Sequence, residues 1–235
     1  MTKKDKTKSI SFTDTLGVSK EYAPKSAVHF IPDWYKGMET YFPKERTPDS
    51  LPTIKKCIPV LDAITAGYII VSPCDVYVSF KDGEPDFRSS LSNIIGFPKI
   101  VSFHDRKQGY AHPLANEHKF PKWTNPWGIK TPSGYSCLFK PPAHNPNPWF
   151  QILEGIVDTD TYNATVNFPF VLKNTTEDFI IPAGTPIAQV IPFKRDGWTS
   201  QILNGDEVQR KTMARLESRF FDRYKHMFWN RKTYS

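Results

Sequence analysis

The chain has 235 residues, of which 39% are hydrophobic and 14% aromatic, and it carries a formal net charge of +7. This composition excludes a chain that is disordered over most of its length, because it supplies enough apolar surface to form a core. No apolar run approaches the roughly 18 residues of a membrane-spanning helix, so we expect no membrane partner. The charge lies at the ends, since residues 1–8 and 206–235 are basic and residues 9–205 are neutral overall. Basic ends favour nucleic acid or an acidic partner, although terminal lysines can also serve solubility alone.

Proline and cysteine usage indicates the fold class and the cellular compartment. The 21 prolines stand mostly between short apolar runs, which is typical of short strands joined by rigid turns and not of a helical bundle. The three cysteines, Cys57, Cys74 and Cys137, show no close pairing and no zinc spacing, which indicates a reducing compartment. No apolar stretch follows the N-terminal lysines, so we expect no signal peptide.

The chain divides into three parts. Residues 1–27 are polar with little periodicity and predict a basic N-terminal arm, either flexible or laid on a partner. Residues 28–200 predict one β domain, which begins with an aromatic strap over 28–50 and holds an insertion around 84–126. Residues 201–235 predict a C-terminal amphipathic basic helix.

Alternating apolar residues and turn signals place the strands within the β domain. Lys81-Asp82-Gly83 is a hairpin signal, and Thr131-Pro132-Ser133-Gly134 has the residue types of a β-turn. We expect strands over 54–60, 68–80, 94–103, 127–130, 135–140, 150–157, 164–173, 179–181 and 187–193.

The C-terminal helix, centred on 205–229, carries two stripes. The apolar stripe recurs at spacings of three and four, with Met213, Leu216, Phe220, Tyr224 and Met227. The basic stripe recurs every four residues, with Lys211, Arg215, Arg219 and Arg223. Three interpretations stay open: the helix docks on its own β domain, it pairs with another subunit, or its basic stripe binds the phosphates of a nucleic acid.

Three runs stand in an order found in one protein family. They are Gly128-Ile-Lys-Thr-Pro-Ser-Gly-Tyr135, Gly155-Ile-Val-Asp-Thr-Asp-Thr-Tyr162 and Ile181-Pro-Ala-Gly-Thr-Pro-Ile-Ala-Gln-Val190. With Ala66-Gly67-Tyr68, they resemble the dUTPase and dCTP deaminase superfamily, most clearly over 128–193. The resemblance implies a mostly-β fold, namely a dUTPase-like β-clip or distorted β-barrel.

The resemblance also implies a ligand site. Asp158 resembles the carboxylate that orients the attacking water as a general base, and Tyr162 resembles the aromatic platform under the sugar. Gln189 resembles the strand residue that supports the pocket, and Tyr135 and Asp160 complete the expected ligand-binding set. An enzyme of this kind would use Mg²⁺. The alternative is that Asp158 and Asp160 only stabilise the turn and that Tyr162 only contributes to packing.

The sequence departs from the family at the residues that hold phosphate. Ile69 stands where the family has an aspartate, and Pro141-Pro142-Ala143-His144 replaces a segment with arginine and serine. No glycine-rich arm follows residue 200. A triphosphate is costly to hold without positioned donors, and a fold does not imply a function. We therefore expect a non-catalytic binding or virion assembly protein, with a diverged nucleotide pyrophosphohydrolase or deaminase-like enzyme using Asp158 as the alternative.

The whole chain also resembles proteins of tailed bacteriophages, especially in 155–170 and 181–198. This directs the expected location to the host cytoplasm or the virion. The expected partners are further copies of the chain or phage structural proteins, with a nucleotide or nucleic acid as a further possibility through the basic termini. The histidines of the insertion, His104, His112 and His118, have irregular spacing, so we predict no metal site.

Overall fold

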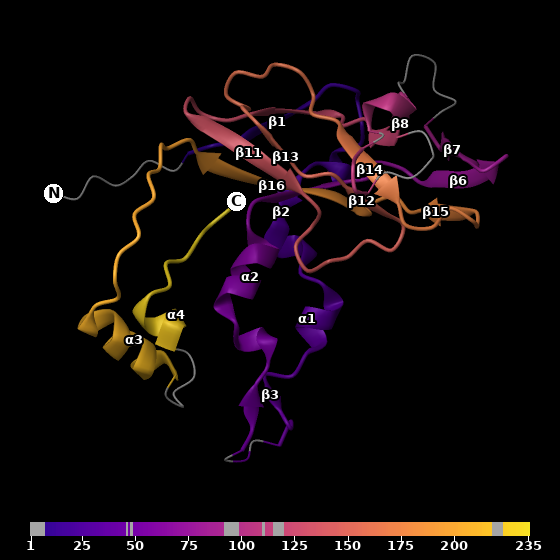
Figure 1. Cartoon of the computed structure of the whole chain (residues 1–235). Helices are drawn as coiled ribbons and strands as arrows, with labels where there is room; N and C mark the ends of the chain where they lie inside the picture. Colours follow the sequence, from indigo (N-terminus) through magenta and orange to yellow (C-terminus); the bar gives the residue numbers. More distant parts are fainter. Residues whose placement is uncertain are drawn as a thin grey trace.

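The computed structural model describes residues 8–45, 47, 49–91, 99–109, 111–114, 120–217 and 223–235 (Figure 1). Their strands are β1 (Ser11–Asp14), β2 (Lys25–Ser26), β3 (Tyr41–Phe42), β4 (Leu51–Pro52), β5 (Tyr68–Val71), β6 (Val76–Lys81), β7 (Glu84–Ser89) and β8 (Val101–His104). The chain continues with β9 (Phe120–Trp123), β10 (Trp127–Lys130), β11 (Tyr135–Lys140), β12 (Phe150–Ile152), β13 (Gly155–Val157), β14 (Phe168–Leu172), β15 (Phe179–Ile181) and β16 (Pro186–Lys194). The α-helices are α1 (Asp33–Gly37), α2 (Ile58–Thr65), α3 (Glu207–Glu217) and α4 (Arg223–Met227).

The fold is mostly β, as expected, and it consists of several antiparallel sheets. A five-stranded sheet has the order β13-β11-β16-β5-β2, a four-stranded sheet the order β12-β14-β9-β8, and a three-stranded sheet the order β15-β6-β7. The pairs β1-β10 and β3-β4 stand as two-stranded ribbons. The described strands form no closed barrel, and the more specific expectation of a dUTPase-like β-clip or distorted barrel stays a prediction.

One apolar core joins the three large sheets. The rings of Trp123, Phe150 and Phe170 lie within 5.4 Å of one another, centroid to centroid, and all three side chains are buried. Phe139 of the five-stranded sheet contacts Phe168 of the four-stranded sheet at 5.7 Å. Aromatic pairs at these separations add to the stabilisation that burial itself provides.

Residues 8–27, which belong to the predicted N-terminal arm, pair with the sheets. From residue 8 on, the chain is integrated: β1 pairs with β10, β2 pairs with β5, and Val18 is buried in the core. The sequence did not show this, because the pairing partner of β1 lies more than 110 residues away. Only residues 1–7 of the predicted arm lie outside the described residues.

The segment predicted as a strand over 54–60 is helical instead. A 3-10 turn over Ile54–Lys56 leads into α2, which has Pro59 in its first turn, where a proline fits a helix without loss. The insertion 84–126 is more regular than expected, since β7 completes the predicted hairpin at Asp82 and Gly83. Its remaining described strands, β8 and β9, join the four-stranded sheet. Of the strand expected over 94–103, residues 94–98 lie outside the described residues.

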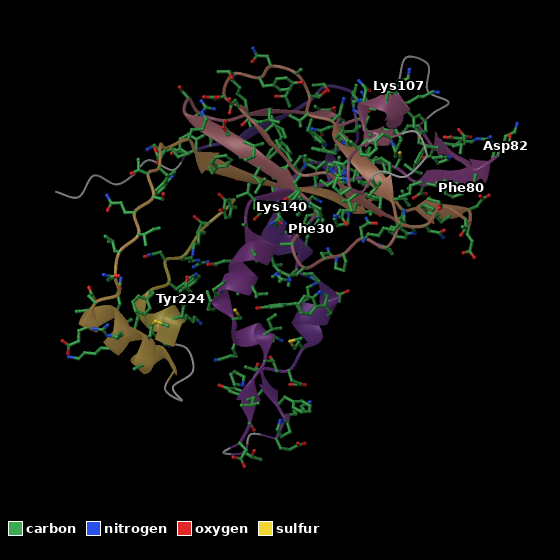
Figure 2. All side chains as sticks on the ribbon, viewed as in Figure 1. Phe30, Phe80, Asp82, Lys107, Lys140 and Tyr224 are labelled. Carbon is green, nitrogen blue, oxygen red and sulfur yellow. The ribbon has the colours of Figure 1, made fainter. Side chains whose placement is uncertain are left out.

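The predicted C-terminal helix is present as α3 and α4, with 218–222 outside the described residues. Figure 1 shows both helices standing apart from the sheets, and Figure 2 shows Tyr224 on α4 well away from the Asp82 hairpin. Val208 and Met213 of α3 are exposed, so no packed apolar face confirms the predicted amphipathic character. None of the described helices is both long enough and apolar enough to cross a membrane.

Candidate functional site

Two of the predicted site residues, Asp158 and Asp160, are brought together at one end of the five-stranded sheet. β11 lies between β13 and β16, with Cys137 opposite Val157 and Tyr135 opposite Lys194. The turn that follows β13 therefore meets the first residues of β11 and the residue after β16. This places Asp158 and Asp160 beside Ser136 and Arg195, four residues that we call the aspartate–arginine cluster.

Arg195 is the centre of this cluster. Its guanidinium donates from Nη1 to Asp160 Oδ1 at 2.8 Å and from Nη2 to Asp160 Oδ2, which is a two-point ion pair. Nη1 also lies 3.1 Å from Asp158 Oδ1 and 3.0 Å from Ser136 Oγ. Ser136 Oγ in turn donates to Asp158 Oδ1 at 2.6 Å. One arginine thus holds both of the aspartates that the sequence singled out.

Two further hydrogen bonds hold the turn that carries the aspartates. Thr159 stands between them, is fully buried, and shares a 2.7 Å hydrogen bond between its hydroxyl and that of Thr131. The backbone N–H of Gly134 donates to Asp160 Oδ2 at 2.8 Å. Gly134 has φ +83°, a conformation that glycine adopts without strain and that suits the turn before β11.

The two carboxylates differ in exposure and in electrostatics. The Asp160 side chain is 4% exposed and the Asp158 side chain is 61% exposed. The hydrogen bond from Arg195, followed by the one from the Gly134 N–H, lowers the pKa of Asp160 to about 2. The pKa of Arg195 is raised, chiefly by the hydrogen bond to Asp160. Asp160 is therefore an ionised, hydrogen-bonded group near neutral pH and a weak proton acceptor.

The cluster is formally negative. Two aspartates face one guanidinium, and neighbouring Lys194 is neutralised by Asp196 at 2.5 Å. Charge-assisted hydrogen bonds of this kind join the turn after β13 to the ends of β11 and β16. The cluster offers no surplus positive charge for a polyphosphate.

Tyr135 and Tyr162 have different surroundings. The Nζ of Lys8 sits 4.5 Å above the Tyr135 ring, and the Tyr135 carbonyl accepts from Thr131 Oγ1 at 3.1 Å. Tyr162 is 44% exposed and lines a cavity of about 250 Å³ against β1 and β10. Asp158 and Asp160 do not line this cavity.

Gln189 is fully buried within β16. Its Nε2 donates to the carbonyls of Ala63 at 2.9 Å and Ala66 at 2.7 Å, and its Oε1 accepts from the N–H of Ala143 at 2.9 Å. The side chain thus ties β16 to the end of α2 and to the proline-rich loop. All three contacts are to backbone, so the role that the geometry supports is positioning of the surrounding chain.

The basic stripe can be described only at its first residue. Lys211 Nζ forms an ion pair with Glu207 Oε1 at 2.6 Å, one helical turn away. Nothing is described of the side chains of Arg215 and Arg223, and Arg219 lies outside the described residues. Contact of this stripe with nucleic acid or a protein partner stays a prediction.

The sequence reasoning missed Arg195 and Ser136. The family motif places an arginine and a serine in 141–144, where this chain has neither. The sequence did contain a signal for Arg195. If 135–140 pairs antiparallel with 187–193, the residues that follow 193 lie beside the start of 135–140. Among the described residues, no three of the types His, Cys, Asp and Glu gather where they could hold a metal ion.

Comparison with known proteins adds little. No protein-family model matches the chain, and no curated protein matches it. A solved structure described as a dUTPase of Staphylococcus bacteriophage 80alpha, a glycine-to-serine mutant with dUpNHpp, is 15% identical, with a TM-score of 0.30. The match covers 60% of this chain and 76% of that one. The likeness is distant, and no site is transferred from it.

Proposed function

We propose that the chain is a non-catalytic binding or assembly protein, encoded by a phage and acting as a structural component of the virion. The observation that carries the proposal is the aspartate–arginine cluster. The residue that would activate water, Asp158, shares one oxygen between Arg195 and Ser136. Its neighbour Asp160 is nearly buried in a two-point ion pair. The cluster therefore links the turn after β13 to β11 and to the residue after β16.

The chemistry of phosphoryl transfer supports the same conclusion. A triphosphate needs preorganised positive donors around its oxygens. The described cluster contains one guanidinium, which two carboxylates already occupy. A polyanion bound to this guanidinium would compete with both aspartates for it.

Exposed apolar side chains support a role in binding other proteins. A soluble monomer rarely leaves large apolar residues exposed in groups, and such groups mark interaction surfaces. The β3–β4 ribbon exposes the cross-strand pair of Phe42 at 76% and Leu51 at 67%. The C-terminal segment exposes Trp198, Ile202, Leu203, Val208, Met213, Met227 and Phe228.

The deciding experiment is nucleotide turnover by the purified protein, with dUTP, dCTP and the other nucleotides in the presence of Mg²⁺. We expect neither pyrophosphate nor ammonia release above background. Release that disappears in Asp158→Asn would overturn the proposal and identify an enzyme. Asp86→Asn is the matched control, because Asp86 is also a partly exposed aspartate paired with an arginine, Arg88 at 3.0 Å.

The virion role is tested separately by mass spectrometry of purified particles of the phage that encodes the chain. We expect peptides of the chain in stoichiometric amounts in the particles. Recovery from the lysate alone would count against a structural role in the virion and leave a binding role in the host cell.

A further inference from the structure

The stretch between β16 and α3 runs in the open from the sheets to the C-terminal helices (Figure 1). Its residues 196–206, which we call the linker, are all exposed and belong to no helix or strand. Asn204 and Gly205 lie near the end of the linker, and they form the one asparagine–glycine pair in the sequence. A glycine after an asparagine favours reaction between the two residues, because glycine has no Cβ to obstruct its own backbone nitrogen.

The two groups that would react are not engaged elsewhere. Among the described residues, the amide side chain of Asn204 makes no hydrogen bond, and the backbone N–H of Gly205 has no acceptor. A Cβ on Gly205 would meet a single neighbour, Gln209 Oε1 at 3.5 Å, so the space around this backbone is open. The Asn204 side chain can therefore rotate onto the Gly205 nitrogen without breaking a contact.

We propose that Asn204 is a site of spontaneous covalent modification, at which the chain deamidates through a succinimide ring. The Gly205 backbone nitrogen loses its proton to water and attacks Asn204 Cγ. A bond between this nitrogen and Cγ forms, the bond from Cγ to Nδ2 breaks, and Nδ2 leaves as ammonia after taking up a proton. Water then opens the ring at either carbonyl carbon and leaves aspartate or isoaspartate at position 204. The net reaction consumes one water and releases one ammonia, so it needs no oxidant, reductant or enzyme.

The new carboxylate would stand just before α3. Asp206 caps this helix, since its Oδ1 accepts from the Gln209 N–H at 2.7 Å. Arg210 reaches back past the cap, and its Nη1 donates to the Gly205 carbonyl at 3.3 Å. Arg210 pairs with no carboxylate among the described residues, so the added negative charge at position 204 gains a guanidinium close by. In the isoaspartate product the main chain also passes through the former side-chain carbon, which lengthens the linker.

Other described asparagines lack this combination of features. Asn163 is exposed and precedes a small residue, but its Oδ1 accepts from Lys130 Nζ at 3.1 Å and the next residue, Ala164, carries a Cβ. Three more precede proline, whose nitrogen has no proton to lose and cannot attack: Asn125, Asn145 and Asn147. Modification is therefore expected at Asn204 well before these positions.

The test is peptide mapping by mass spectrometry of the purified full chain, incubated at mildly alkaline pH in water enriched in heavy oxygen. We expect the peptide that holds Asn204 to be replaced over time by two products of equal mass, aspartate and isoaspartate, each with one heavy oxygen from the water. The loss should speed up as pH rises, because the attacking nitrogen must give up its proton. Gly205→Ala is the matched control, because it adds a Cβ in open space and keeps Asn204 in place. It should slow the loss about tenfold.

A synthetic peptide of residues 199–210 provides the rate for an unstructured chain, and we expect the folded protein to react at a similar rate. Much slower loss in the folded protein would show that the linker is protected and would overturn the proposal. Equally fast loss at Asn163, or an unchanged rate in Gly205→Ala, would overturn it as well. These outcomes do not depend on nucleotide turnover, so the modification can fail while the non-catalytic role stands.

Discussion

Replacing Gln189 with leucine tests whether this buried amide acts as a structural link. The substitution keeps the side-chain volume close to that of glutamine and removes both polar atoms. Three backbone groups lose their partner: the carbonyls of Ala63 and Ala66 and the N–H of Ala143. Because Gln189 is 0% exposed, water cannot replace these hydrogen bonds without opening the structure.

The expected cost follows from the number of bonds. A buried hydrogen bond contributes about 1 kcal/mol net, so three lost bonds lower the free energy of unfolding by about 3 kcal/mol. The cavity contribution is small, because the volume is conserved. For a chain of this size, about 2–4 °C of Tm accompanies each kcal/mol, so Tm should fall by about 6–12 °C.

The assay is urea denaturation followed by tryptophan fluorescence, with thermal unfolding by circular dichroism as a second measurement. The midpoint should fall at an unchanged m-value, which marks a stability change in a chain that unfolds in the same way. Gln151→Leu in β12 is the matched control, because Gln151 is a strand glutamine with an exposed side chain. If Gln189→Leu stays within about 0.5 kcal/mol of this control, which is the usual range for surface changes, the structural role assigned to Gln189 is refuted.

The acid stability of the fold should depend on Asp160. Its pKa is about 2 in the folded chain against an ordinary 3.8, so its ion pair with Arg195 stabilises the fold fully above pH 3.8 and loses this effect as pH falls toward 2. Asp160→Asn should flatten that part of the pH dependence of the urea midpoint, and an unchanged acid limb in the variant would contradict the assignment. Gly67→Ala should abolish folding or lower Tm steeply, because a Cβ there would meet the Val190 carbonyl oxygen and φ is +69°. Gly83→Ala has a similar φ and open space, so it should cost only about 1–2 kcal/mol; equal losses in the two variants would refute the steric argument.

Much of the β domain was predictable from local pattern. The expected strands at 127–130, 135–140 and 179–181 coincide with β10, β11 and β15, and the expected hairpin at Asp82 and Gly83 joins β6 to β7. These elements were accessible because alternation and turn chemistry act over a few residues. The predicted strand over 54–60 was wrong, since a short apolar run fits either a strand or a buried helix.

The candidate site shows where local reasoning ends. Its aspartates were visible in the sequence, but their partner Arg195 lies 35 residues beyond Asp160 in the chain. The role of Gln189 rests on contacts with α2, more than 120 residues earlier. Both relations follow from strand pairing, which composition and spacing do not specify.

The sequence by itself determined a mostly-β chain with short strands, the turns between them and basic ends, because these follow from composition and from the two-residue period of a strand. Only the tertiary structure decided that residues 8–27 join the sheets, that Asp158 and Asp160 pair with Arg195, and that Lys232 pairs with Asp62. The physical reason is that antiparallel pairing joins residues far apart in the chain. A side chain's chemistry depends on the partners that this pairing brings to it.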